Sequence, residues 1–299
     1  MFTWQCAFRI VLLLILSSVG VLHSSLAQEA DQVEDPAAWK KDLIGKLAGS
    51  QAGFQNWAEG GVNTLAFSSG LDGAAERTSG GWHQKYQSRL AFGLVKQDTS
   101  DVRKAEDMIR LQATFQHLGT GSLDKFSPTV ALTARSQFAA GFNYEKNPFE
   151  ETKALPVKVS DFLSPGTFSQ AVGMTYQHRE NLSQRLGVGG KQTVVLDEEL
   201  RELYSLDADQ TVRVEFGIEA YTEYQKEIFT NVNVKSTLGL FALFNKPDSP
   251  DMFWETQVGM KVNSWLQVNF EWGVLYDEDV SKNVQLKEIF SVGVSYQFL

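Results

Sequence analysis

The stretch IFSVGVSYQFL, residues 289–299, decides the fold. Phe290, Val292, Val294 and Tyr296 alternate in it with small or polar residues, so one face is apolar and the other is not. Side chains of a β-strand point alternately to opposite sides, and strands that cross a membrane use this period to present one face to lipid. The stretch therefore predicts a membrane-spanning β-strand.

The same alternation recurs along the chain at intervals of about 22 residues, between turn-forming Gly, Asn, Asp, Ser and Pro. In one such run Val212 and Phe216 oppose Arg213 and Glu215. Several runs exceed the five or six residues that are usual in soluble proteins. The twelve predicted strands are residues 41–54, 60–71, 82–96, 105–118, 125–145, 166–177, 183–196, 210–225, 229–244, 252–263, 265–276 and 284–299.

An even number of such strands predicts an all-β fold, a closed antiparallel up-and-down transmembrane β-barrel of about twelve strands. Closure pairs every edge hydrogen bond where lipid offers no partner. A large soluble sheet with one wet face is the alternative. Aromatic residues near strand ends are expected to form interfacial girdles. These residues are Trp57, Trp82, Trp254, Trp272, Tyr144 and Tyr276.

The lengths of the connections also favour a bacterial outer-membrane barrel, in which periplasmic turns are short and extracellular loops are long. Two connections depart from this rule: residues 55–59 are too few for a loop, and residues 72–81 are too many for a turn. The asymmetry places both termini in the periplasm. The short connections are residues 119–124, 179–182, 226–228 and 263–264, and the long ones are residues 98–104, 146–165, 197–209 and 245–251.

The amino terminus has the features of a secretory signal peptide. Arg9 precedes an apolar run, residues 10–16, and small residues lead to a cleavage site after Ala27. A retained membrane anchor is the alternative, but a spanning helix needs about 20 apolar residues. We therefore predict a signal peptide, a periplasmic segment and an outer-membrane barrel in a Gram-negative cell. Their bounds are residues 1–27, 28–38 and 39–299.

Cleavage at this site would remove Cys6, which is the one cysteine of the chain, and Arg9. The remaining part then has no disulfide and no thiol nucleophile. It keeps 26 basic and 36 acidic side chains, a net charge of about −10. Such acidity argues against a nucleic-acid partner.

Short motifs follow one another along the chain in a recognisable order. They are WAEGG at 57–61, Arg103-Lys104 with Asp107, Thr133 with Gln137 and Gly141, DFLSP at 161–165, Tyr276-Asp277 with Asp279, QLKE at 285–288, and Gly293 with YQF at 296–298. On these motifs the chain resembles an uncharacterised family of outer-membrane β-barrel proteins, the Bacteroidetes-type DUF3078-like proteins, over about residues 39–299. The resemblance implies a barrel in the outer membrane and supplies no catalytic or binding residues. Leu299 departs from the aromatic residue with which such barrels often end.

The face opposite to lipid gives the best indication of function, because its charged residues are expected to line the lumen. Opposite charges in a confined space should pair, since an unpaired one is costly. The sequence therefore favours a passive channel or transport-related barrel for a small polar solute, with a polar, charge-paired lumen. The alternative is a structural or interaction barrel with a plugged lumen and functional extracellular loops. The predicted lumen residues are Arg89, Arg135, Arg213, Glu215, Glu219, Glu255, Lys261 and Glu271.

Other kinds of chemistry have weaker support. A lipid-modifying enzyme would need a base among His83, His117 and His178, and none of them stands in a catalytic motif. The acidic run 277–279 lacks the spacing of a calcium loop, and residues 187–191 lack the spacing of a phosphate loop. We predict no enzyme, no cofactor and no metal. The expected partners are outer-membrane lipid, the barrel-assembly machinery and a small polar solute.

Overall fold

A computed structural model describes residues 38–53, 62–121, 124–149 and 153–299. Residues 36–299 form one structural unit. The predicted signal peptide, most of the predicted periplasmic segment, Trp57 and the connection 55–59 lie outside the described residues.

Twelve strands close into an antiparallel barrel, as the sequence predicts. Consecutive strands pair around the wall except where β6 and β7 leave it between β5 and β8. β1 and β14 complete the circle, with Ile44 opposite Gln297 and Ala48 opposite Gly293. The barrel strands are β1 (Lys40–Ala52), β2 (Thr64–Ser79), β3 (Trp82–Gln97), β4 (Arg103–His117), β5 (Phe126–Ser136), β8 (Gly166–Arg179), β9 (Leu182–Val194), β10 (Val212–Phe229), β11 (Val232–Leu243), β12 (Lys246–Lys261), β13 (Leu266–Asp277) and β14 (Ser281–Gln297).

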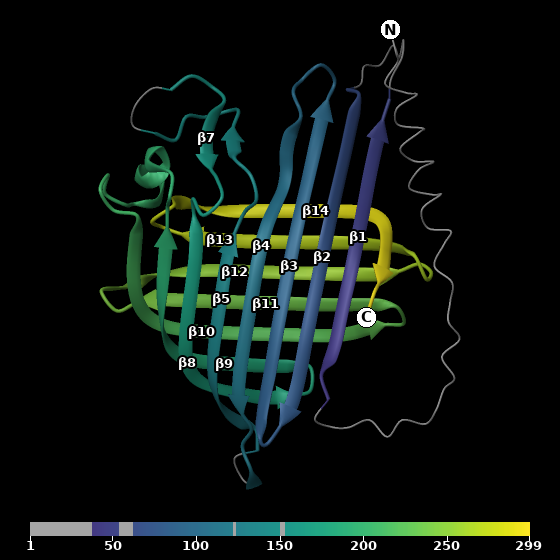
Figure 1. The fold of residues 1–299 in the computed structure, drawn as a ribbon, viewed down its shortest axis with the longest axis vertical. Coiled ribbons are helices and arrows are strands. Elements are labelled where there is room, and N and C mark those ends of the chain that lie inside the picture. Colours follow the sequence, from purple (N-terminus) through teal and green to yellow (C-terminus); the bar gives the residue numbers. More distant parts are fainter. Residues whose placement is uncertain (1–37, 54–61, 122–123, 150–152) are drawn as a thin grey trace. The chain divides into compact units, whose positions relative to one another are not determined.

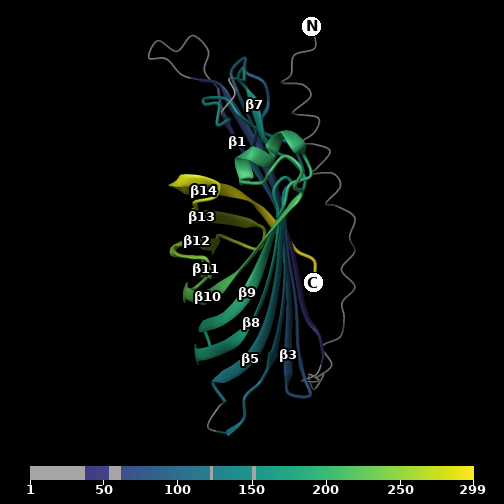
Figure 2. The ribbon, with the colours of Figure 1, turned by 90° about the vertical axis from the view of Figure 1, so that its left-hand side faces the viewer.

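The barrel is flattened, so that two parts of its wall face each other. Strands β10–β14 cross behind β1–β4 at a large angle (Figure 1), and the turned view has β3 on one side and β11–β14 on the other (Figure 2). The wall bends sharply at β8 and β9, where Gly173 pairs with Gly187. A Cβ at Gly173 would overlap the Leu186 carbonyl oxygen, so this bend requires glycine.

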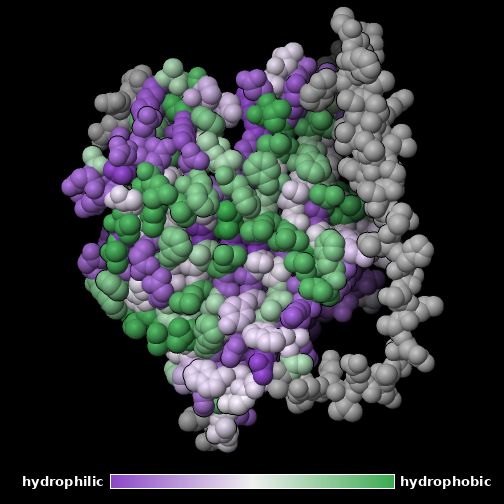
Figure 3. All heavy atoms as spheres, viewed as in Figure 1, coloured by the Kyte–Doolittle hydropathy of each residue, from purple (hydrophilic) through white to green (hydrophobic). Residues whose placement is uncertain are grey.

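The outward face of the barrel is apolar. Leu286 is 73% exposed and Phe290 is 66% exposed, and the outward residues of β10, such as Phe216, are also exposed. Hydrophobic side chains gather over the middle of the face formed by the first strands, while hydrophilic ones dominate the end near β7 (Figure 3). A closed wall with an apolar exterior is the arrangement that allows β-structure to lie in a bilayer.

A small subdomain, which we call the cap, lies at one end of the barrel. It consists of β6 (Gly141–Asn143), β7 (Val157–Ser160) and the 3-10 helix η2 (Glu198–Tyr204) with their flanking loops. β6 and β7 pair with each other in a separate two-stranded sheet. No helix in the described part of the chain is long and apolar enough to cross a membrane. The cap has its own apolar core, formed by Phe149, Val157, Val195, Leu200, Tyr204 and Leu206.

The structure corrects several predicted boundaries. The run 125–145 is not one strand, because β5 ends at Ser136 and the chain then turns into the cap. The connection predicted at 72–81 is short, since β2 continues to Ser79 and Gly80-Gly81 alone form the turn. Both glycines have positive φ, of 59° and 79°, which suits a tight hairpin.

Two further predictions are wrong at the other end of the barrel and in its wall. The connection predicted at 245–251 is short, because β12 begins at Lys246. Trp254 and Trp272 lie in the middle of β12 and β13 and not near their ends, where they contact each other edge to face with ring centroids 4.8 Å apart. Trp82 is the first residue of β3, where a girdle residue is expected.

Candidate functional site: the charged lumen

A row of arginines crosses three neighbouring strands on the inner face of the barrel. Arg89 on β3 is the register partner of Arg110 on β4, and Arg110 is the partner of Arg135 on β5. Asp72 on β2 begins the row as the partner of Arg89. Like charges that lie directly opposite each other destabilise a sheet, so this row needs compensation from elsewhere.

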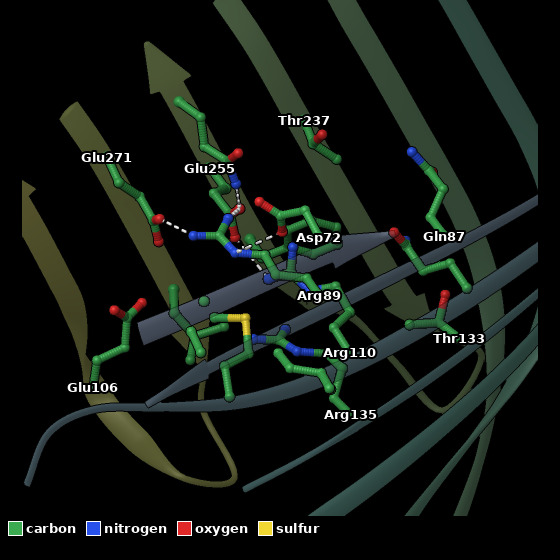
Figure 4. Close-up of a pocket in the computed structure, with 18 of the residues that line it drawn as sticks. Asp72, Gln87, Arg89, Glu106, Arg110, Thr133, Arg135, Thr237, Glu255 and Glu271 are labelled. Atoms are coloured by element: carbon green, nitrogen blue, oxygen red, sulfur yellow. Dashed lines mark hydrogen bonds and ion pairs between the residues drawn. The ribbon is translucent and has the colours of Figure 1, made fainter. Parts of the chain in front are cut away.

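Carboxylates on the facing wall supply most of that compensation. Glu255 on β12 accepts hydrogen bonds from Arg89 Nη1 at 2.8 Å and from Arg110 Nη2 at 2.6 Å. Arg89 also pairs with Glu271 on β13 (Figure 4). Four strands separate β3 from β12 along the wall. These ion pairs therefore cross the lumen and connect its two sides.

The network extends from both ends of the arginine row. Lys287 on β14 donates to Glu271 at 2.9 Å and to Glu106 on β4 at 3.2 Å. Lys46 on β1 donates to Asp72 at 2.6 Å. All these side chains are less than 40% exposed. Together with the arginine row, these charges form one connected network of ion pairs that joins the two facing parts of the wall.

A second cluster lies nearer to the cap. Lys191 on β9 pairs with Asp251 on β12 and lies 3.2 Å from Glu215 on β10 and 3.5 Å from Asp277 on β13. Arg213 adds contacts of 3.3 Å to Glu215 and 3.2 Å to Asp279.

Two further pairs lie toward the opposite end. Lys85 donates to Glu223 at 2.9 Å, from β3 to β10, and Arg185 donates to Glu219 at 2.8 Å. The Arg185 guanidinium also stacks over Tyr221, 4.6 Å from the ring centroid. These pairs keep the inner face polar over much of its length.

One cavity of about 1160 Å³ runs among these side chains. Its lining includes Val159 and Tyr204 of the cap at one end. At the other end it includes Gln225 and Asn233, which flank the β10–β11 turn, and Gln267 near the start of β13. The same cavity thus reaches residues at both ends of the barrel.

The structure places the residues predicted for the lumen in three groups. Some line the cavity: Arg89, Arg135, Glu219, Glu255 and Glu271. Arg213 and Glu215 belong to the cluster below the cap. Lys261, the last residue of β12, is exposed and is not among the cavity residues. Prediction from the sequence missed Arg110, Lys191, Lys287 and the acidic partners Glu106 and Glu223, although they share the inward alternation of their strands.

The cap is held over the barrel by residues from the sequence motifs described above. The Asp107 carboxylate accepts from the backbone N–H groups of Phe138 at 2.7 Å and Ala139 at 3.0 Å. Lys104 donates to Asp107 at 2.9 Å. Gln137 donates to the carbonyl oxygens of Asp161 and Ser164. The motifs therefore meet at the junction where the chain leaves β5 for the cap.

Ion pairs and burial also fix the cap itself. The hydrogen bond from Lys158 and the backbone N–H of Phe162 lower the pKa of Asp161 below its ordinary 3.8. The hydrogen bonds that Lys158 donates to Asp161 and Asp197 raise the pKa of Lys158. Burial raises the pKa of Tyr204 to about 12, so its hydroxyl stays protonated and donates to Val159 O at 2.8 Å.

The three histidines take part in contacts typical of structural residues. His83 Nδ1 lies 3.0 Å from the Thr78 hydroxyl, and His117 packs edge to face on Trp82. His178 packs against Tyr176. All three lie near the short-turn end of the barrel, as interfacial aromatic residues do.

The two loop-like motifs also have structural roles. In the acidic run 277–279, Asp277 faces Lys191, Glu278 lies 3.0 Å from Lys246 and Asp279 faces Arg213. Because each carboxylate has its own cationic partner, the three do not converge. Within the described residues, no group of three or more His, Cys, Asp or Glu side chains could hold a metal. Residues 187–191 lie in the middle of β9 and not in a loop.

A closed barrel with an apolar exterior and a charged interior is a transmembrane β-barrel of the outer-membrane type. Residues 50–142 of the chain match the family described as a protein of unknown function, DUF3078, which confirms the resemblance noted in the sequence. No curated protein matches the chain in sequence.

Solved structures that resemble the chain are outer-membrane proteins. The COG4313 outer membrane channel from Pseudomonas putida F1 shares 12% identity at a TM-score of 0.37, over 91% of this chain and 98% of its own. The NanC porin shares 11% at a TM-score of 0.38, over 85% and 98%. The translocator domain of the autotransporter NalP from Neisseria meningitidis shares 11% at a TM-score of 0.35, over 98% and 96%.

Proposed function

We propose that the protein is a passive outer-membrane channel for small polar solutes, with a narrow, charge-paired lumen. The observation that supports this most directly is a cavity whose lining reaches the cap at one end and the β10–β11 and β12–β13 turns at the other. Its polar side chains can replace part of the hydration of a solute. The cross-lumen pairs made by Arg89 would limit the size of what passes.

The proposal includes an orientation. The cap and the connection between β9 and β10 lie at the end opposite to the tight turns Gly80-Gly81, 180–181 and 230–231. Short turns are typical of the periplasmic side. The cap would then face the exterior and both termini the periplasm, after removal of residues 1–27 and insertion into outer-membrane lipid by the barrel-assembly machinery.

Planar-bilayer recording tests the channel. The folded protein should give discrete conductance steps in 1 M KCl, while protein boiled before addition should give none. Liposome swelling with sugars of increasing size should show uptake that ends at small solutes. Absence of both conductance and swelling, with protein that still migrates as a folded barrel in mild detergent, would contradict the proposal.

A second candidate function is a scaffold that presents the cap to a partner. The separate apolar core of the cap and its exposed Phe142, Leu155 and Phe162 favour it. A variant in which Phe142, Leu155 and Phe162 are all replaced by serine should then lose partner capture while its barrel stays folded. If this variant still conducts at the wild-type level, the conductance is a property of the barrel and does not depend on these exposed residues of the cap.

A further inference from the structure

The arginines of the row are not equally paired with carboxylates. Arg89 contacts Glu255 and Glu271, and Arg110 contacts Glu255. Arg135 stands next to Arg110 in the register, yet no carboxylate of the described residues lies within salt-bridge distance of it. Arg110 and Arg135 appear together at the edge of the network in Figure 4. The row therefore ends in an unpaired guanidinium inside the barrel.

The nearby carboxylates are all paired with other cations. Oε1 of Glu255 accepts from Arg89 and from the side chain of Gln257, and its Oε2 accepts from Arg110. Glu271 is shared between Arg89 and Lys287, and Glu106 accepts from Lys287. Around the row, five cations (Arg89, Arg110, Arg135, Lys46 and Lys287) thus meet four carboxylates (Asp72, Glu106, Glu255 and Glu271), because Asp72 contacts both Lys46 and Arg89.

Residues with hydroxyl groups occupy the inward positions next to Arg135 in the sheet. Thr167 on β8 is its register partner, and the next inward pair is Thr133 with Ser169. Arg135 and these three residues all line the cavity. In the described part of the chain the three hydroxyls make no hydrogen bond, so they are free to donate to a ligand. An arginine with hydroxyl residues at the neighbouring inward positions offers the donors that an oxyanion needs, since the oxygens of an oxyanion accept two parallel N–H bonds from arginine.

We infer that Arg135, with Thr133, Thr167 and Ser169, binds the oxyanion group of a small solute, a carboxylate or a phosphate, in the lumen. A cation without an ion pair in a partly dry site is costly, and a bound anion reduces that cost. The inference rests on the proposed function in one respect: if the barrel is a channel, this site should let anions pass in preference to cations. The chain as a whole carries a net charge of −9, so its overall acidity would give the opposite preference.

Reversal potentials across a KCl gradient test the selectivity. Wild-type channels should prefer chloride over potassium, and Arg135→Gln should lose that preference. Lys226→Gln, which removes an exposed lysine near the turn end of β10, is the matched control and should behave as wild type. Inorganic phosphate and acetate, added separately, should reduce the chloride current, and whichever acts at lower concentration identifies the preferred oxyanion. Arg135→Gln should raise the effective concentration at least about tenfold.

A binding measurement that needs no ion current distinguishes failure of this inference from failure of the proposed function. If the barrel does not conduct, phosphate should still raise the unfolding temperature of the detergent-folded protein, and Arg135→Gln should abolish that rise. Conductance without anion preference, or block by phosphate that is the same in Arg135→Gln, would overturn the site while leaving the channel. If Arg135→Gln does not fold, Arg135→Lys decides: it keeps the charge and loses the fork of donors, so chloride preference should remain and phosphate affinity should fall. Unchanged phosphate affinity in that variant would also overturn the site.

Discussion

Glu255 connects two arginines of the row to the facing wall, because it accepts from both Arg89 and Arg110. We expect Glu255→Gln to lower the free energy of unfolding by about 2–3 kcal/mol. A dry buried pair that loses one partner costs roughly 3–5 kcal/mol, and the cavity beside this one leaves room for water, which reduces the cost. Urea unfolding in lipid vesicles, followed by tryptophan fluorescence, measures the change.

A second carboxylate provides the control for that experiment. Glu180 is exposed in the tight turn between β8 and β9, so Glu180→Gln removes the same charge from a solvated position. It should change the unfolding free energy by no more than about 0.5 kcal/mol. Equal losses in the two variants would mean that the lumen pairs contribute nothing specific.

Asp161 gives the cap a dependence on pH. Its pKa is lowered below 3.8 by Lys158, so the stabilisation is present above pH 3.8 and is lost as the pH falls through the lowered value. The pKa of Lys158 is raised above 10.5, so its part is lost only when the pH rises beyond that value. A spin label on Ala154→Cys should therefore be immobile between about pH 4 and 10 and become mobile below that window. With Asp161→Asn, the label should be mobile at neutral pH too; an immobile label there would show that the pair does not hold the cap.

At the scale of elements, the bend at β8 and β9 depends on glycine. A Cβ at Gly173 would overlap the Leu186 carbonyl oxygen and would come within 2.5 Å of Gly187 Cα. Because backbone atoms of a paired strand cannot move aside without breaking the ladder, Gly173→Val should prevent closure of the barrel. Heat-modifiable migration in detergent gels measures this. Gly49→Val on β1, where the nearest atom to an added Cβ is 3.6 Å away, should fold normally. Normal migration of Gly173→Val would exclude a close approach at this bend.

The strands that could be predicted from the sequence are those whose outward residues are large and apolar. β10 and β13 satisfy this over nearly their whole length, so their predicted and observed bounds agree within a few residues. The end of β2 was missed because its outward residues there are Gly73, Ala75 and Arg77, which carry no apolar signal. The end of β5 was missed for the opposite reason, since Phe138 and Phe142 continue the alternation after the chain has left the barrel.

The pairing inside the lumen could be predicted only in part. Alternation within a strand tells which side chains face inward, and it places Arg89 and Glu255 on that face. Which inward charges meet depends on the flattening of the barrel, which brings β3 against β12 and β13 although four strands separate β3 from β12 along the wall. The alternation within a single strand carries no information about which strands face each other across the lumen. The unpaired state of Arg135 is equally a property of the closed barrel and not of its own strand.

At the scale of the whole molecule, the cap is a separate folded layer at one end of the lumen. Its residues Val159, Leu203 and Tyr204 line the same cavity as the charged network. Asp107 and Gln137 connect it to the barrel through hydrogen bonds to backbone groups. Such an arrangement lets the cap loosen without disturbing the strand pairing of the wall, because β6 and β7 pair only with each other.

If the barrel conducts as proposed, loosening the cap should therefore change its conductance and not its folding. Tyr204→Ala removes a buried ring from the core of the cap, a loss of about 3 kcal/mol that the small subdomain can hardly tolerate. We expect larger or longer single-channel openings from this variant, with wild-type migration of the folded barrel in detergent gels. Tyr204→Phe keeps the ring and loses only the hydrogen bond to Val159 O, so its conductance should stay close to wild type. If Tyr204→Ala conducts as wild type does while a label on Ala154→Cys has become mobile, the cap does not obstruct the lumen, and the narrowest point must lie at the ion pairs between Arg89 and the carboxylates of β12 and β13.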